Sequence, residues 1–379
     1  MTFNRTLVLS QLSLTLLIAA FMGGPATFGA SFTGFMVYGA PLESEPPDFG
    51  PRPETPPTDR DFRIWLTGDP SDARVVPQDG PALLLMGGST EVEQAFRDRA
   101  LKVANGGDVV VLRTSGTDGY NDYLFEMRSD ELKPNSVETL RIREPAEANS
   151  DYVQWVVRSA ELIWFAGGDQ STYLNAWEGT KLQSAMQEAF ERGAVIGGTS
   201  AGLAILGEFI YDPDNVDSAT AEIAAANPYD ETMAISGRFL DAPILDSVIT
   251  DTHFEQRDRL GRLMGFMAQL RQDGRTGRIA GVGVNEQTSI FIDSQGIGHV
   301  DAQDSSAGRA AYVLIEDDQT TATQVQPNQP LIYRNVLRTK LVPGDTFDFN
   351  TMTSPKTPVR LTIDGTANPF YSPANPYQP

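Results

Sequence analysis

The residue with the clearest potential for chemistry is Ser200, which stands in Gly198-Thr-Ser-Ala-Gly202. This pentapeptide fits G-x-S-x-G and follows a short apolar run at residues 194–196. A serine in a tight turn between a strand and a helix exposes its hydroxyl, and N–H groups at the helix start can stabilise an oxyanion. The pattern predicts a nucleophilic serine, with Ala201 and Gly168 as oxyanion-hole residues. A glycine-rich turn in which the serine is only a helix N-cap is an equal alternative from the pattern alone.

A nucleophilic serine needs a base, and histidine is the usual one near neutral pH. The chain has only two histidines, His253 and His299. His299 lies in a turn between predicted strands, which favours an exposed structural role. His253 closely follows the apolar residues 247–249 and precedes an amphipathic pattern at residues 260–270. We therefore predict that His253 is the base, at the carboxyl end of a strand on the same sheet edge as Ser200.

A third, acidic residue should orient the imidazole and stabilise its charged form. The segment between the serine and the histidine offers several acids, and the residues alone do not choose among them: Asp212, Asp214, Asp217, Glu222 and Asp230.

Three arginines, Arg257, Arg259 and Arg262, closely follow the predicted base. Guanidinium groups bind carboxylates through paired hydrogen bonds, so the cluster predicts recognition of an acidic substrate. Pairing with neighbouring surface acids is the alternative. Asp169 and Gln170 follow the glycines that end another predicted strand, where they would bind substrate or the oxyanion, or cap the next helix.

Several kinds of site find no support in the sequence. The chain has no cysteine, its two histidines are isolated, and there is no H-E-x-x-H motif, so we predict no metal site. The spacing G-x-G-x-x-G is absent after Gly87 and Gly88, and we predict no cofactor. The formal net charge of −21 argues against a nucleic-acid partner.

The elements that would position these residues alternate between strand and helix. Short apolar runs at residues 82–86, 162–166 and 194–196 read as strands, and residues 108–113 and 137–142 also read as strands. Residues 92–104, 152–159 and 182–190 read as helices. Runs that are apolar throughout indicate a parallel sheet covered on both faces. The predicted fold is a doubly wound, mostly parallel α/β sheet, with ligands bound beyond the carboxyl ends of the strands.

The two ends of the chain have a different character. Residues 1–30 have the layout of a secretory signal peptide, with Arg5, an apolar run and small residues, and we expect cleavage after Ala26 or Ala30. An uncleaved N-terminal anchor is the alternative. Residues 31–60 read as a proline-rich linker, residues 61–305 as the α/β domain, and residues 306–379 as a β-rich extension ending in a loose tail.

Taken together, four motifs in order make the chain resemble the cyanophycinase family of serine peptidases. They are Phe165-Ala-Gly-Gly-Asp-Gln170, Gly198-Thr-Ser-Ala-Gly202, Asp251-Thr-His-Phe with Arg257, Arg259, Gly261 and Arg262, and Gly281-Val-Gly-Val284. The resemblance runs over about residues 81–288. It implies a relationship to aspartyl dipeptidase and a fold of the class I glutamine amidotransferase type.

The resemblance also implies roles for individual residues. Ser200 would be the nucleophile, His253 the base and Glu222 the closest match to the family's acid. The pocket for a β-linked Asp-Arg unit would be lined by Gln170, Asp251, Arg257, Arg259 and Arg262. This chain departs from the family in carrying Thr252 where cyanophycinases tend to have glutamine, and in a longer segment between serine and histidine.

The resulting hypothesis is an exported periplasmic or extracellular serine exopeptidase that acts on cyanophycin or other β-aspartyl peptides. Its partner would be a peptide, with no nucleic acid and no membrane contact after signal removal, and the sequence leaves a homodimer open. A lipase-like carboxylesterase and a catalytically silent exported binding protein of the same fold are the competing hypotheses.

Overall fold

The computed structural model describes residues 45–59, 61–306 and 308–378. Over these residues it contains a nine-stranded sheet in the order β1-β4-β3-β5-β6-β2-β11-β12-β16. The five strands from β4 to β2 are parallel, and the flanking strands pair antiparallel. The strands are β1 (Arg63–Gly68), β2 (Ala82–Met86), β3 (Asp108–Arg113), β4 (Ser136–Arg141), β5 (Leu162–Phe165), β6 (Val195–Thr199), β11 (Thr288–Ile292), β12 (Ile297–Ala302) and β16 (Thr346–Asp348).

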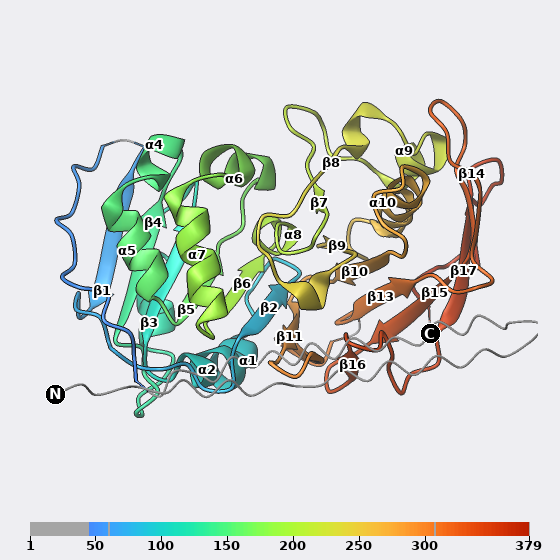
Figure 1. Ribbon diagram of the computed structural model, residues 1–379. Helices are drawn as coiled ribbons and strands as arrows, with labels where there is room; N and C mark the ends of the chain where they lie inside the picture. The colour runs from blue at the N-terminus through green and yellow to red at the C-terminus, as the bar shows by residue number, and fades with distance from the viewer. Residues whose placement is uncertain (1–44, 60, 307, 379) are drawn as a thin grey trace, which may run out of the picture. The chain divides into compact units, whose positions relative to one another are not determined.

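Helices pack on both faces of this sheet (Figure 1). Successive side chains of β2 point to opposite faces: Leu83 and Leu85 join one apolar cluster, whereas Leu84 and Met86 join another. One face carries α1 (Glu93–Ala95), a π-helical turn η1 (Phe96–Ala100), α2 (Leu101–Ala104) and α3 (Asn121–Phe125). The other carries α4 (Pro145–Ala148), α5 (Asp151–Ser159), α6 (Gln170–Trp177), α7 (Lys181–Glu191) and α8 (Ala201–Ala204).

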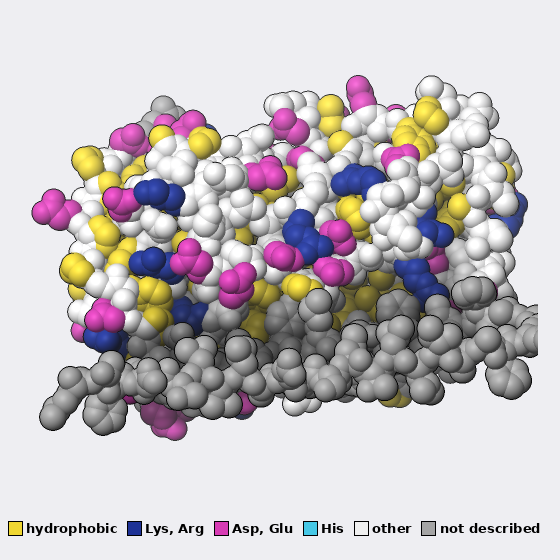
Figure 2. All heavy atoms as spheres, in the orientation of Figure 1, with side chains coloured by type: hydrophobic (Ala, Val, Ile, Leu, Met, Phe, Trp, Pro, Cys, Tyr) yellow, Lys and Arg dark blue, Asp and Glu magenta, His cyan; other side chains and the backbone are white. Residues whose placement is uncertain are grey.

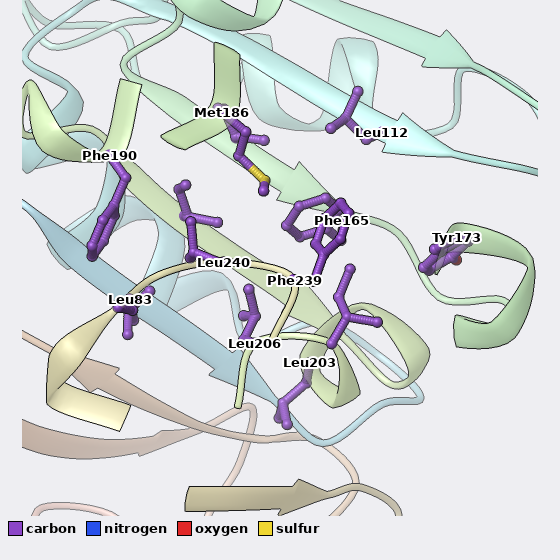
Figure 3. Packing of buried hydrophobic residues seen from close by; sticks show 14 of the residues in the cluster. Leu83, Leu112, Phe165, Tyr173, Met186, Phe190, Leu203, Leu206, Phe239 and Leu240 are labelled. Carbon is purple, nitrogen blue, oxygen red and sulfur yellow. The ribbon is translucent and has the colours of Figure 1, made fainter. Parts of the chain in front are cut away.

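Figure 3 shows the second of these faces from close by, with Met186 and Phe190 of α7 beside Leu83 and Phe165 of the sheet. All four side chains are almost fully buried. Apolar contacts of this kind fix the position of β6 and therefore of the turn that follows it.

A second sheet holds seven strands within the described part of the chain, in the order β18-β17-β15-β13-β10-β9, with β14 paired to β15. Only β9 and β10 run parallel to each other. Its strands are β9 (Val248–Asp251), β10 (Ala280–Val284), β13 (Ala311–Ile315), β14 (Thr321–Gln324), β15 (Ile332–Leu341), β17 (Val359–Asp364) and β18 (Tyr371–Ser372).

Helices α9 (Ala221–Ala226) and α10 (Leu260–Gln272) share an apolar cluster with one face of the second sheet. The opposite face, including Val282 and Val313, shares its cluster with Ile290 and Val300 of the first sheet. The chain passes directly from β10 in one sheet to β11 in the other. Short elements complete the fold: β7 (Ile210–Tyr211) paired with β8 (Ile235–Ser236), and the 3-10 turns η2 (Glu231–Met233) and η3 (Pro243–Leu245).

The predicted α/β class with a parallel central sheet and a β-rich C-terminal part is confirmed, and the bounds of the five predicted strands differ from those observed by at most three residues. Two details differ. The strand before His253 belongs to the second sheet, not to the sheet that carries Ser200. The C-terminal tail is packed rather than loose, because the Tyr377 side chain is buried.

The N-terminal predictions fall largely beyond the described residues, since the signal segment 1–30 and residues 31–44 lie outside them. In the described part of the linker, Arg52 donates to Glu138 and to Tyr152, each at 2.5 Å, so this part is attached to the domain. No helix among the described residues is long and apolar enough to cross a membrane. Figure 2 shows acidic side chains dispersed over the visible face, with lysines and arginines among them.

Candidate active site

Ser200 occupies a strained turn between β6 and α8. Its backbone has φ 54° and ψ −119°, a conformation that L-residues rarely adopt outside functional sites. The Ser200 N–H donates to the Met86 carbonyl at 3.1 Å, which ties the turn to β2.

The two glycines of the motif are explained by close backbone contacts. A Cβ on Gly198 would lie 2.4 Å from the carbonyl carbon of Gly202, and a Cβ on Gly202 would lie 2.3 Å from the carbonyl oxygen of Phe165. Any larger residue would push the turn away from the sheet. The structure therefore has the strand, turn and helix that a nucleophilic serine requires.

His253 comes from the other sheet, two residues after β9 ends. Its Nε2 lies 2.8 Å from Ser200 Oγ, and its backbone N–H donates to the Gly87 carbonyl at 2.8 Å. The imidazole packs against Gly88, where a Cβ would come within 2.6 Å of Nε2. Gly88 thus makes room for the ring, and the predicted pairing of serine and histidine is present in the structure.

Glu286 completes the hydrogen-bonded chain. Its Oε1 lies 2.7 Å from His253 Nδ1, and its N–H donates to Gln256 Oε1 at 3.0 Å. With Nδ1 donating to the carboxylate, Nε2 is left to accept the proton of Ser200, which is the order of contacts in a catalytic triad.

Glu222, the acid expected from the resemblance, is not at this position. It lies in the first turn of α9, on the side of Tyr371, whose pKa is raised mainly by burial and by Asp258, with a smaller contribution from the charge of Glu222. The acids predicted from the sequence lie between Ser200 and His253, whereas Glu286 follows both residues in the chain. A usable signal existed: β10 runs parallel to β9, so Glu286 and His253 leave the same edge of one sheet.

The environment of His253 favours the neutral imidazole. Burial lowers its pKa below the usual value, and the charges of Arg257 and Arg259 act in the same direction, against the opposing effect of Glu286. A neutral imidazole is the form that accepts a proton from serine.

Asp251 and Arg262 form a buried ion pair. Arg262 Nε donates to one carboxylate oxygen at 2.7 Å and Nη2 to the other at 2.6 Å, while Nη1 donates to Ser218 Oγ at 2.7 Å. Both side chains are almost completely buried. The two residues were predicted to bind substrate, but in the structure they bind each other. The pair holds the loop that carries His253.

Arg257 and Arg259 are placed differently. Arg259 Nη1 donates to the Thr252 carbonyl at 2.9 Å and to its hydroxyl at 3.1 Å, and burial lowers the Arg259 pKa to about 10. Arg257 is exposed. The Arg257 N–H donates to the His253 carbonyl at 3.1 Å and Arg259 binds Thr252, so both arginines belong to the loop that carries His253, and their charges oppose protonation of its ring.

The remaining predicted residues surround the serine or stabilise helix ends. A Cβ on Gly167 would lie 3.6 Å from Ser200 Cβ, so the end of β5, with Gly168, lies beside the nucleophile. Ala201 is the first residue of α8. Asp169 caps α6 through the Ser171 N–H at 3.0 Å, and Gln170 Nε2 donates to the Tyr211 carbonyl at 2.9 Å.

Two tyrosines near the C-terminus hold the loop after His253, and sequence reasoning missed them. The Tyr377 hydroxyl donates to Asp258 at 2.7 Å and accepts from the Leu260 N–H at 3.1 Å. The Tyr371 hydroxyl accepts from the Gly261 N–H at 2.9 Å. They satisfy N–H groups at the start of α10 that have no partner within the helix.

Parts of this chain are similar to known peptidases. Residues 83–299, more than half of the chain, match the model of peptidase family S51. A cyanophycinase of Trichormus variabilis is 24% identical over 222 residues, which cover 58% of this chain and 67% of that protein. A cyanophycinase of Synechococcus elongatus is 25% identical over 219 residues, covering 57% and 61%. A crystal structure of a peptidase from an acI-B1 Actinobacterium covers 71% of this chain and 97% of its own, with 14% identity and a TM-score of 0.46.

The matched span contains the serine, the histidine and the glutamate of the hydrogen-bonded chain. The family expected from the motifs is confirmed. The chain belongs to peptidase family S51 and is a peptidase hydrolase of the serine type.

Proposed function

We propose that the protein is an exported exopeptidase that hydrolyses cyanophycin or other β-aspartyl peptides through an acyl-enzyme on Ser200. The observation that carries the mechanism is the continuous chain of hydrogen bonds from Ser200 Oγ through His253 to Glu286. Sequence similarity to two cyanophycinases supports the substrate class.

In the proposed reaction, His253 Nε2 takes the hydroxyl proton as Ser200 Oγ attacks the scissile carbonyl carbon. The carbonyl oxygen becomes an oxyanion, for which the N–H groups of Ala201 and Gly168 are the nearest candidates. Collapse breaks the C–N bond, and the imidazolium gives its proton to the leaving amine. Water then attacks the acyl ester with the same histidine as base, which releases the acid and restores Ser200.

Arg257 and Arg259 support an acidic substrate. They place two positive charges near His253 in a chain whose formal net charge is −21. A substrate carboxylate at the chain end or on an aspartyl residue would be bound by such guanidinium groups, because charge-assisted contacts are stronger than neutral ones.

The direct test is incubation with cyanophycin and a panel of α- and β-aspartyl dipeptides, with products identified by mass and Ser200→Ala as the inactive control. We expect hydrolysis of the β-aspartyl substrates. Activity on short esters alone would indicate a carboxylesterase, and inertness toward both classes would indicate a binding protein.

Arg259→Lys tests the role of the arginine in substrate recognition. Lysine keeps the charge but loses the planar fork, so kcat/KM for aspartyl peptides should fall roughly tenfold, while cleavage of a neutral activated ester changes little. Arg271→Lys, at the far end of α10, is the matched control. Equal losses on both substrates would assign Arg259 to the fold alone.

Export is proposed from the pattern of residues 1–30. N-terminal sequencing of the mature protein after expression of the full chain should show cleavage after Ala26 or Ala30. An intact N-terminus on a cell-associated product would contradict export by signal cleavage.

A further inference from the structure

The loop of residues 253–259, which begins two residues after β9 ends, supports two members of the hydrogen-bonded chain at once. The Arg257 N–H donates to the His253 carbonyl at 3.1 Å, so the loop folds back on the base. The Gln256 side chain accepts the Glu286 N–H at 3.0 Å. A shift of this loop would therefore move the base and the acid together, relative to the nucleophile.

The backbone of this loop is strained at two residues. His253 has φ 46° and Asp258 has φ 42°, in the left-handed region that residues with a side chain rarely adopt. Such conformations persist only where the surrounding structure holds them. The Asp258 N–H donates to the Glu255 carbonyl at 3.2 Å within the loop, but the Asp258 side chain is bound by residues from a distant part of the chain. These distant residues therefore help to hold the strained end of the loop.

The residues that bind Asp258 are Tyr371 and Tyr377, near the C-terminus. Both hydroxyls lie within hydrogen-bonding distance of the same Asp258 oxygen, Tyr377 at 2.7 Å and Tyr371 at 3.1 Å. The same hydroxyl oxygens accept the N–H groups of Leu260, at 3.1 Å, and of Gly261, at 2.9 Å. Two side chains thus bind one carboxylate oxygen and two backbone groups where the loop ends.

The tail that carries these tyrosines, residues 369–378, is itself held on the second sheet by two basic residues of β15. Arg338 Nη1 donates to the Pro376 carbonyl at 2.8 Å, and Lys340 Nζ donates to the Tyr377 carbonyl at 2.9 Å. Arg338 is only 1% exposed, and its Nε has no hydrogen-bond partner among the described residues. A buried charge is costly without partners, so the tail carbonyl stabilises Arg338 and is fixed by it.

The tail also contacts the start of the loop. The Tyr377 ring packs edge to face on Phe254, the residue after His253, with centroids 6.0 Å apart. Both rings pack on Tyr312, at 5.6 Å and 5.5 Å between centroids. The Tyr312 hydroxyl donates to Glu255 Oε2 at 2.7 Å. The tail therefore reaches the loop on both sides of its strained backbone.

The tail lies outside residues 83–299, the span that matches the family model. We propose that Tyr371 and Tyr377 are positioning residues for catalysis, which act through the loop on the base and the acid. The proposal rests on the proposed mechanism, because it takes His253 as base and Glu286 as acid. It adds a requirement for a segment of the chain beyond the matched span.

Removing the two hydroxyls tests the proposal. In the double variant Tyr371→Phe with Tyr377→Phe, kcat for a neutral activated ester should fall roughly 10- to 100-fold, because a small displacement of a reacting group is costly. The ester is chosen because it has no carboxylate for the arginines to bind. Tyr333→Phe is the matched control, since this buried tyrosine of the same sheet donates its hydroxyl to Glu316 at 2.7 Å, and its kcat should change little.

Two variants of Asp258 distinguish the hydrogen bonds from the backbone conformation. Asp258→Asn keeps an oxygen that accepts both hydroxyls, whereas Asp258→Gly removes it, and both residues tolerate a left-handed backbone. Asp258→Asn should keep most of the wild-type kcat, and Asp258→Gly should resemble the double tyrosine variant. A wild-type kcat in a folded Asp258→Gly protein would overturn the proposal.

A measurement without substrate separates this proposal from the proposed function. The chain has two histidines, so the ring signals of His253 and His299 are readily assigned in a ¹H–¹³C spectrum, with His299 as internal reference. Burial is the largest influence on the pKa of His253 and lowers it. Arg257 and Arg259 act in the same direction, and Glu286 acts in the opposite one. Release of the loop exposes the ring, so the pKa of His253 should rise in the double tyrosine variant.

The outcomes of this titration are distinct. If the pKa of His253 rises but no aspartyl peptide is hydrolysed by the wild-type protein, the tail does position the base and the proposed substrate is wrong. An unchanged titration of His253 in the folded double variant would overturn the proposal even where the free energy of unfolding has fallen, because the tyrosines would then support the fold alone.

Discussion

Ser200 belongs to the nine-stranded sheet and His253 to the seven-stranded sheet, and the two halves of the candidate active site are held in position by different forces. On the serine side, glycine contacts and apolar packing fix the turn after β6. On the histidine side, a buried ion pair and two tyrosine hydroxyls fix the loop after β9. The site is therefore an interface between two sheets, with Glu286 on the connection that joins them.

This difference predicts different ways to damage each side. On the serine side, loss of the Ser200 hydroxyl should leave the fold of the turn unchanged, because the Ser200 N–H and the neighbouring glycines hold it. The histidine side depends on polar groups that are costly to leave unpaired. Substitutions there should reduce activity through the position of the ring as well as through its chemistry.

The largest expected effect is the loss of either reacting group. Ser200→Ala and His253→Ala should each lower kcat by roughly 10⁴-fold or more, and the double variant should be little worse, because triad members act as a unit. Circular dichroism and steady-state kinetics check fold and rate together. Substantial turnover by a folded Ser200→Ala protein would contradict the mechanism.

The next effect separates two glutamates. Glu286→Gln should lower kcat by roughly 10³-fold, because the amide no longer stabilises the charged imidazole in the required orientation. Glu222→Gln should stay within about twofold, since α9 does not bring that side chain to His253. The reverse result would mean that Glu222 reaches the ring in the working enzyme.

The buried ion pair gives a stability effect. Arg262→Met leaves Asp251 buried and unpaired, and should cost about 3–5 kcal/mol in the free energy of unfolding. Denaturant unfolding measures this, and the exposed Arg271→Met is a control expected to change stability far less. A variant of unchanged stability but reduced affinity for substrate would restore the substrate-binding role that the sequence suggested for Arg262.

The smallest effect concerns pH. Because burial lowers the pKa of His253, the acid limb of kcat/KM should lie below the usual histidine value, with activity lost as the pH falls through it. Removing the charge in Arg257→Gln should raise this pKa and move the limb upward by roughly 0.2–0.5 pH unit, a small shift because Arg257 is exposed. A downward shift, or none, would mean that Arg257 does not act on the ring.

The same comparison explains what could be predicted from the sequence. The nucleophile was accessible because Gly198-Thr-Ser-Ala-Gly202 marks a local turn, and the base because the chain has only two histidines. The local sequence motif is enough to predict the nucleophile, and the small number of histidines is enough to predict the base.

The acid and the arginines depend on tertiary structure. Glu286 is 33 positions beyond His253 and reaches it only because β9 and β10 are parallel neighbours. The arginines cannot be told apart in the sequence. In the structure Arg262 is buried and paired with Asp251, whereas Arg257 is exposed. The packed tail was missed for a similar reason: its prolines suggested a loose end, whereas Tyr371 and Tyr377 satisfy N–H groups of α10.

The most direct test of the account is the rate at which a fluorophosphonate probe labels the protein, with the labelled peptide identified by mass spectrometry, because the probe reports an activated serine without assuming a substrate. A triad of Ser200, His253 and Glu286 predicts one label, on Ser200, formed much more slowly in His253→Ala and Glu286→Gln and at the wild-type rate in Glu222→Gln. A label on another serine, or a rate that Glu286→Gln leaves unchanged, would contradict a catalytic triad built across the two sheets.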